Sequence, residues 1–84
     1  MNKTKTAEYI VKLANLEKKI LKLEKEIDEN FEQSSLYFDL GIPLTKEMID
    51  NTNRLGAEIN QAITDFRYYN MLMEESQDFS FHLN

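Results

Sequence analysis

Two long stripes of apolar residues, separated by a short segment with a glycine and a proline, dominate the sequence. In the first stripe, apolar side chains recur at alternating steps of four and three between positions 9 and 27. This heptad spacing places them on one face of a helix. The stripe consists of Tyr9, Leu13, Leu16, Ile20, Leu23 and Ile27. It predicts a helix over about residues 5–40.

The segment after this helix predicts a turn over residues 41–44. Gly41 can adopt the left-handed conformation that ends a helix, and Pro43 cannot continue one. Thr45 is a favourable N-cap, so a second helix is predicted over about residues 45–76. Its stripe again advances by four and three. The members are Met48, Thr52, Leu55, Ile59, Ala62, Phe66, Tyr69 and Met73.

The two stripes predict a single all-α domain over residues 1–84, a long antiparallel two-helix hairpin resembling a coiled coil. A turn centred near Pro43 places Ile27 opposite Ile59. A glycine inside a helix costs about 1 kcal/mol relative to alanine, so we expect a close helix approach at Gly56 to offset that cost. The predicted helix-packing residues are Leu13, Leu16, Ile20, Leu23, Ile27, Leu55, Gly56, Ile59 and Phe66.

The C-terminal segment, residues 77–84, shows a different pattern. Phe79, Phe81 and Leu83 recur at every second position, which is typical of an extended chain. The sequence therefore predicts an extended tail. The tail either docks on the hairpin or adds to a partner as a strand.

Composition indicates how such a short chain gains stability. A domain of this size usually depends on disulfides, a metal or self-association. The 84 residues include no cysteine, and His82 is the single histidine. Disulfides, thiolate sites and imidazole clusters are therefore excluded. We expect no metal and no cofactor, and we expect a homodimer that forms a four-helix bundle.

The charges are divided unevenly along the chain, whose formal net charge is −5. Residues 1–27 hold seven lysines and four glutamates, whereas residues 28–84 hold three basic and eleven acidic residues. A basic first helix beside an acidic second helix favours their pairing. The acidic excess argues against a nucleic-acid partner. Without a long apolar run or a signal peptide, a cytoplasmic protein that does not bind membranes is expected.

Catalytic patterns are missing from the sequence. No glycine-rich phosphate loop is present, and His82 lies in the predicted tail, where no rigid element orients it. We therefore expect a protein that is not an enzyme.

Surplus apolar residues are the strongest functional indication. Residues 66–73 are apolar almost all the way round a helix, and residues 36–40 are similarly dense. A single neighbouring helix covers only one stripe, and apolar surface that remains exposed marks interfaces. The candidate partner-binding residues are Leu36, Tyr37, Phe38, Leu40, Tyr68, Met71 and Leu72. These residues form either the core of a homodimer or a site for a different protein.

One stretch of the second helix, after Gly41, resembles a known motif. Its residues are Thr52, Asn53, Arg54, Leu55, Gly56, Ala57, Glu58 and Ile59. It is similar to Ser-Gln-x-Leu-Asp-x-Leu-Ile in the helical-hairpin aspartyl-phosphate phosphatases of sporulating bacteria, which act on a phosphorylated response regulator. Leu55 and Ile59 match identically, but Gly56 stands where that family has its functional aspartate. The resemblance implies a relative that binds a signalling protein without the catalytic carboxylate.

These observations predict a small regulatory or inhibitory protein of bacterial or phage type, acting by protein–protein interaction through apolar and aromatic helix surfaces. Two alternatives stay open. One is a phosphatase-like regulator of a response regulator. The other is an oligomer that holds a small, nucleotide-like ligand between tyrosine and lysine side chains.

Overall fold

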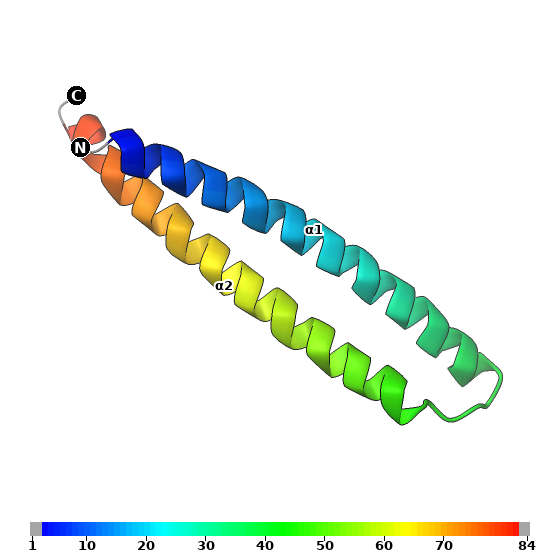
Figure 1. The fold of residues 1–84 in the computed structure, drawn as a ribbon. Helices are drawn as coiled ribbons and strands as arrows, with labels where there is room; N and C mark the ends of the chain where they lie inside the picture. The colour runs from blue at the N-terminus through cyan, green and yellow to red at the C-terminus, as the bar shows by residue number, and fades with distance from the viewer. Residues whose placement is uncertain (1–2, 83–84) are drawn as a thin grey trace.

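The chain folds into an antiparallel hairpin of two long helices, shown in Figure 1. The computed structural model describes the backbone of residues 3–82 and the side chains of residues 5–76. Helix α1 spans Lys3–Asp39 and helix α2 spans Lys46–His82, each with 37 residues. Together they form a rod of 63 × 21 × 14 Å. The predicted all-α hairpin is confirmed, whereas its dimerisation stays a prediction.

Helix α1 ends as its glycine predicts. Gly41 has a φ of +69°, in the left-handed region. Its N–H donates to the Phe38 carbonyl at 3.0 Å, and the Ile42 N–H donates to the Tyr37 carbonyl at 2.9 Å. This pair of hydrogen bonds is the Schellman motif, which satisfies carbonyls at a helix end. The motif stops α1 and reverses the chain.

Helix α2 begins at its predicted cap but continues further than predicted. The Met48 N–H donates to Thr45 Oγ1 at 3.1 Å, so Thr45 is the N-cap. At the other end, α2 continues to His82. The extended segment is therefore wrong over residues 77–82, because no glycine or proline interrupts the helix there. Residues 83–84 lie outside the described residues.

The core occupies the middle of the rod. Leu23, Leu55 and Ala62 are buried there, and Leu55 is only 1% exposed. Partly buried residues packed against this cluster are Leu16, Ile20, Ile27 and Ile59. Leu13 and Met48 are also buried, and Phe66 is half-buried. The apolar stripes of both helices thus meet along one seam.

The helices pair about one turn away from the predicted alignment. Asn30 contacts Asn51 and Thr52, whereas the predicted alignment placed residue 56 opposite it. Thr6 Oγ1 likewise lies 3.3 Å from Ser76 Oγ, whereas the predicted alignment placed residue 80 opposite residue 6. The chain reverses direction at the end of α1, and the loop folds back along α1 before α2 begins. At this offset, residues 36–39 of α1 project beyond the start of α2 (Figure 1).

The close helix approach expected at Gly56 is wrong. A Cβ atom built there has no neighbouring atom within 4 Å. We therefore expect Gly56→Ala to stabilise the hairpin by about 1 kcal/mol, because alanine is the better helix former. Urea unfolding followed by circular dichroism measures this change. The same substitution at Gly41 should destabilise by about 1–2 kcal/mol, because its backbone is left-handed. A destabilised Gly56→Ala would contradict the open space around this position.

Candidate functional site

The heptad stripe of α1 does not stop at Ile27 but continues with polar residues. Asn30, Ser34 and Tyr37 follow at steps of three, four and three, and each is less exposed than its neighbours in sequence. Asn30 is buried, with an exposed fraction of 7%. The seam between the helices is therefore polar in the third of the rod nearest the turn, which we call the turn end (residues 28–50).

Side-chain hydrogen bonds hold this polar part of the seam together. Asn30 Nδ2 donates to Thr52 Oγ1, and Asn51 Nδ2 donates to Asn30 Oδ1 at 3.4 Å. Thr52 Oγ1 in turn donates to the Met48 carbonyl at 2.9 Å. No buried polar side-chain atom among the described residues lacks a hydrogen-bond partner. Because the network is satisfied, it links the two helices without the cost of an orphaned polar group.

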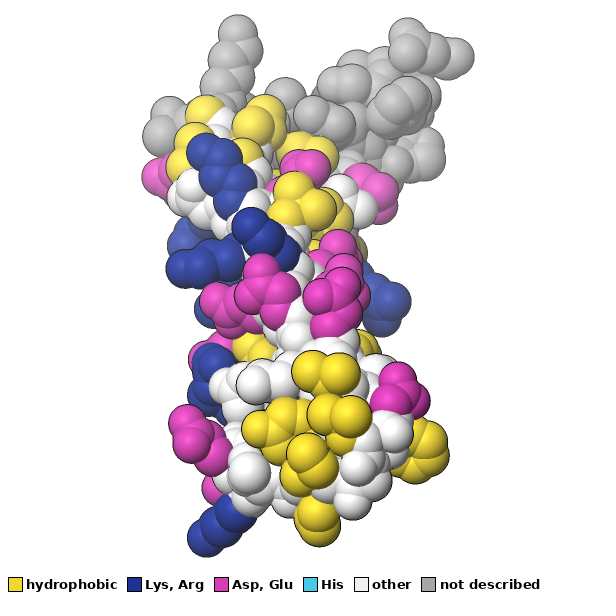
Figure 2. All heavy atoms as spheres, turned by 90° about the vertical axis from the view of Figure 1, so that its right-hand side faces the viewer, with side chains coloured by type: hydrophobic (Ala, Val, Ile, Leu, Met, Phe, Trp, Pro, Cys, Tyr) yellow, Lys and Arg dark blue, Asp and Glu magenta, His cyan; other side chains and the backbone are white. Residues whose placement is uncertain are grey.

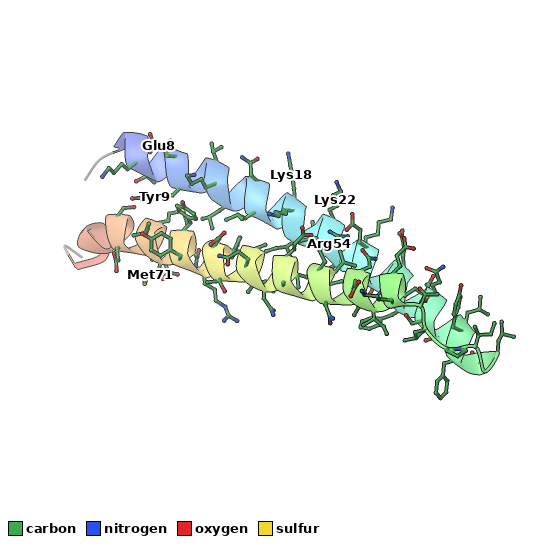
Figure 3. All side chains as sticks on the ribbon, turned by 60° about the horizontal axis from the view of Figure 1, so that its bottom comes forward. Glu8, Tyr9, Lys18, Lys22, Arg54 and Met71 are labelled. Carbon is green, nitrogen blue, oxygen red and sulfur yellow. The ribbon has the colours of Figure 1, made fainter. Side chains whose placement is uncertain are left out.

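Arg54 extends the network to the surface of α2. Its Nη2 donates to Asn51 Oδ1 at 2.7 Å, and its Nη1 forms an ion pair with Glu58 Oε2 at 2.9 Å. Both charged side chains are exposed, so the ion pair itself contributes little stability. Its effect is to orient Asn51, which bonds to the buried Asn30. Arg54 lies close to the seam in Figure 3.

Large apolar side chains cover the outside of the turn end. Seven are exposed there: Phe31, Leu36, Phe38, Leu40, Ile42, Leu44 and Ile49. We call this set the turn-end patch. Figure 2 shows hydrophobic side chains gathered over this end of the rod. Phe38 is 83% exposed, the largest fraction among them. Apart from the buried Met48, polar side chains therefore occupy the seam here and large apolar side chains lie on the surface, unlike in the middle of the rod.

An open groove lies beside the turn-end patch, between the last turns of α1 and the first turns of α2. Its volume is about 800 Å³. Its lining residues are Asn30, Gln33, Tyr37, Thr45, Lys46, Glu47, Met48, Asp50, Asn51 and Arg54. The groove combines amide and charged groups with the ring of Tyr37, so it can accept both polar and apolar parts of a partner.

Acidic residues surround the patch and the groove. They are Asp28, Glu29, Glu32, Asp39, Glu47 and Asp50, all exposed, and Lys46 is the one basic residue in the same range. The turn end therefore carries a formal charge of −5, equal to the net charge of the whole chain. Residues 1–27 and 51–84 carry +3 and −3, which cancel.

Aromatic contacts join the helices at the opposite end of the rod. The Tyr9 and Tyr69 ring centroids lie 6.2 Å apart, and Tyr68 packs edge-on against Tyr69 at 5.2 Å. Lys12 Nζ lies 5.1 Å from the centre of the Tyr69 ring, a cation–π contact across the seam. Figure 3 shows Tyr9 between the helices and Met71 pointing away from α1. The Tyr69 ring is thus engaged in contacts within the hairpin.

The structure separates the predicted partner-binding residues into two groups. Leu36, Phe38 and Leu40 belong to the turn-end patch, and Tyr37 lines the groove beside them. At the opposite end of the rod, Tyr68 and Met71 are exposed whereas Leu72 is half-buried. The two groups therefore form separate surfaces.

Sequence reasoning missed the polar network and half of the patch. Asn30, Asn51 and Thr52 were not proposed as a unit, and four exposed patch members were not candidates. Those four are Phe31, Ile42, Leu44 and Ile49. The available indication was the heptad itself, because extending it past Ile27 places Asn30 in the seam.

The remaining candidate chemistry is limited. Among the side chains that the structure describes, no group of three or more histidine, cysteine or carboxylate residues could hold a metal ion. Within the same part of the chain, neither helix is long and apolar enough to cross a membrane. A shallow hollow of about 320 Å³ involves Lys12, Lys19 and Tyr69, but Tyr9, Tyr68 and Lys12 already contact the Tyr69 ring.

Comparison with known proteins identifies no relative. No family model matches the chain, and no curated protein or solved structure matches it either.

Proposed function

We propose that this protein is a small, non-enzymatic regulatory or inhibitory protein that binds another protein through the turn-end patch. One observation supports this above all, the reversal of polar and apolar positions at the turn end. In a conventional hairpin, apolar residues such as Phe31, Phe38 and Leu40 would lie in the seam and a polar residue such as Asn30 would lie on the surface. Exposed apolar side chains in such number mark an interaction surface.

Rigid local structure presents the patch to its partner. The Schellman motif at Gly41 and the N-cap at Thr45 fix both ends of the loop. The Asn30 network holds the two helices together directly behind it. A loop held by such local hydrogen bonds loses less conformational entropy when a partner docks than an unconstrained loop does.

Self-association is a second part of the proposal and uses the other end of the rod. Ile10, Val11, Tyr68 and Met71 are exposed there. Packing two hairpins through this surface would make a four-helix bundle and cover it. The turn-end patch would then stay available to a different protein.

The self-association is tested by light scattering on the Met71→Glu variant. We expect the wild type to have twice the mass of one chain, and Met71→Glu to have the mass of one chain, because a buried unpaired carboxylate opposes association. Asn53→Glu adds the same charge at an exposed position of the same helix, 18 residues before Met71 and outside the end of the rod proposed to associate. This control should keep the wild-type mass. Equal masses for all three proteins would remove this part of the proposal.

Partner binding is tested by affinity capture from the native host with mass spectrometry. We expect the wild type to retain a partner that Phe38→Ser/Leu40→Ser loses. The control Leu21→Ser removes a leucine of similar exposure, 58% against 64% for Leu40, from the middle of α1. It should retain the partner. A partner list that is identical for the wild type and the turn-end variant would contradict the proposed function. Circular dichroism verifies that all variants fold.

A further inference from the structure

We infer that the turn end binds a basic amphipathic helix of its partner. The inference rests on the proposed function and specifies the chemistry of the partner. It combines three observations at one end of the rod: the turn-end patch, the groove beside it and the concentration of negative charge.

The negative charge of the turn end indicates that the partner segment is positively charged. The turn end has a formal charge of −5 while the rest of the chain sums to zero. A field of one sign attracts the opposite sign and accelerates encounter. Two turn ends would repel each other, so a second copy docked tip to tip is disfavoured. Anionic membranes and nucleic acids are disfavoured for the same reason.

The apolar side chains determine the second property of the partner. They come from α1, from the loop and from the first turn of α2. Figure 2 shows hydrophobic side chains gathered on one face of this end of the rod. A partner segment that covers them must present its own apolar stripe, with basic residues directed at the acidic margin.

The fold favours a helix over an extended strand as this segment. The described residues form two helices and contain no strand, so no sheet edge is available for strand addition. An amphipathic helix can instead place its apolar face on the patch and let larger side chains enter the groove of about 800 Å³. Its lysines or arginines would lie near carboxylates such as Glu32 and Asp39.

The inference is tested with synthetic helical peptides and the full-length protein. One peptide of about 18 residues carries leucines at i, i+3, i+4 and i+7 with lysines elsewhere, and its matched control replaces every lysine by glutamate. Fluorescence anisotropy measures the binding of each. We expect the basic peptide to bind at least about tenfold more tightly than the acidic one, because the charges at the rim are complementary.

Variants separate the apolar and charged contributions to binding. Phe38→Ser/Leu40→Ser should weaken binding of the basic peptide about tenfold, whereas Leu21→Ser should leave it unchanged. Glu32→Gln/Asp39→Asn should weaken it severalfold and reduce its salt dependence. Asp39 lies in the last turn of α1, where a negative charge opposes the helix dipole, so its neutralisation does not endanger the fold.

Several outcomes would overturn the inference. Equal binding of both peptides would show that charge does not select the partner. Loss of binding in Leu21→Ser but not in Phe38→Ser/Leu40→Ser would place the site elsewhere. Binding to anionic lipid vesicles, or a fall in oligomer mass caused by the turn-end variant, would assign the patch to a membrane or to a second copy. Host capture of a partner that depends on the turn end, together with failure of the basic peptide, would refute the inference alone.

Discussion

Leu55→Ala should remove most of the stability of the isolated hairpin. Leu55 is 1% exposed and lies in the cluster with Leu23 and Ala62. Truncating a buried leucine to alanine costs about 2–5 kcal/mol, because apolar contacts are lost and a cavity remains. A small domain with one narrow core has little stability beyond that amount. Thermal unfolding followed by circular dichroism should therefore show a greatly lowered midpoint or no cooperative transition.

The matched control for this prediction is Leu21→Ala. Leu21 lies on the surface of α1 and is 58% exposed, so its truncation should change the free energy of unfolding by no more than about 0.5 kcal/mol. Both variants remove the same atoms from a helix, and they differ only in burial. Similar midpoints for the two variants would contradict the position of the core at the Leu23–Leu55 seam.

Asn30→Ala should cause the second largest loss of stability. Asn30 is buried and forms hydrogen bonds with Asn51 and Thr52, so its removal deprives Asn51 Nδ2 of an acceptor and Thr52 Oγ1 of a donor. An unsatisfied buried group costs about 1–3 kcal/mol. Urea unfolding at a fixed protein concentration measures the loss. Gln33→Ala, an exposed amide on the same helix, serves as the control and should be nearly neutral.

A double variant distinguishes the hydrogen bonds from the space that Asn30 fills. In Asn30→Leu/Thr52→Val, both sides of the buried pair become apolar and of similar size. Replacing both partners of a hydrogen bond can be nearly neutral or stabilising, so this variant should recover part of the stability that Asn30→Ala loses, although Asn51 Nδ2 still lacks the acceptor that Asn30 provided. A double variant less stable than Asn30→Ala would show that unpaired polar groups do not account for the stability lost in Asn30→Ala.

The features predicted correctly from the sequence are those governed by local chemistry. Gly41 stops α1 because glycine tolerates a left-handed backbone, and Thr45 caps α2 because its hydroxyl accepts a backbone N–H. Both effects depend on residues within one turn. The apolar stripes similarly predict which faces meet, since the spacing of each stripe is a property of its own helix.

The features that were missed depend on how the helices meet. The alignment shifts by a turn because the chain folds back after Gly41. The spacing of apolar residues in the sequence does not reveal the course of this loop. The burial of Asn30 follows from this alignment, which brings it to Asn51 and Thr52. Gly56 was expected to allow close packing, but the space beside it is open. Only part of the exposed patch was predicted, because the exposure of residues such as Ile42 and Leu44 depends on the conformation of the loop.

The length of the rod determines how the molecule behaves hydrodynamically. The Cα radius of gyration is 18.8 Å. A compact chain of 84 residues would have a radius of gyration of about 12 Å, and a value near 19 Å belongs to a compact protein of roughly 280 residues. A single hairpin should therefore elute early from a gel-filtration column calibrated with globular standards. Its retention volume alone would imitate an oligomer, so sedimentation equilibrium or light scattering must decide how many chains associate.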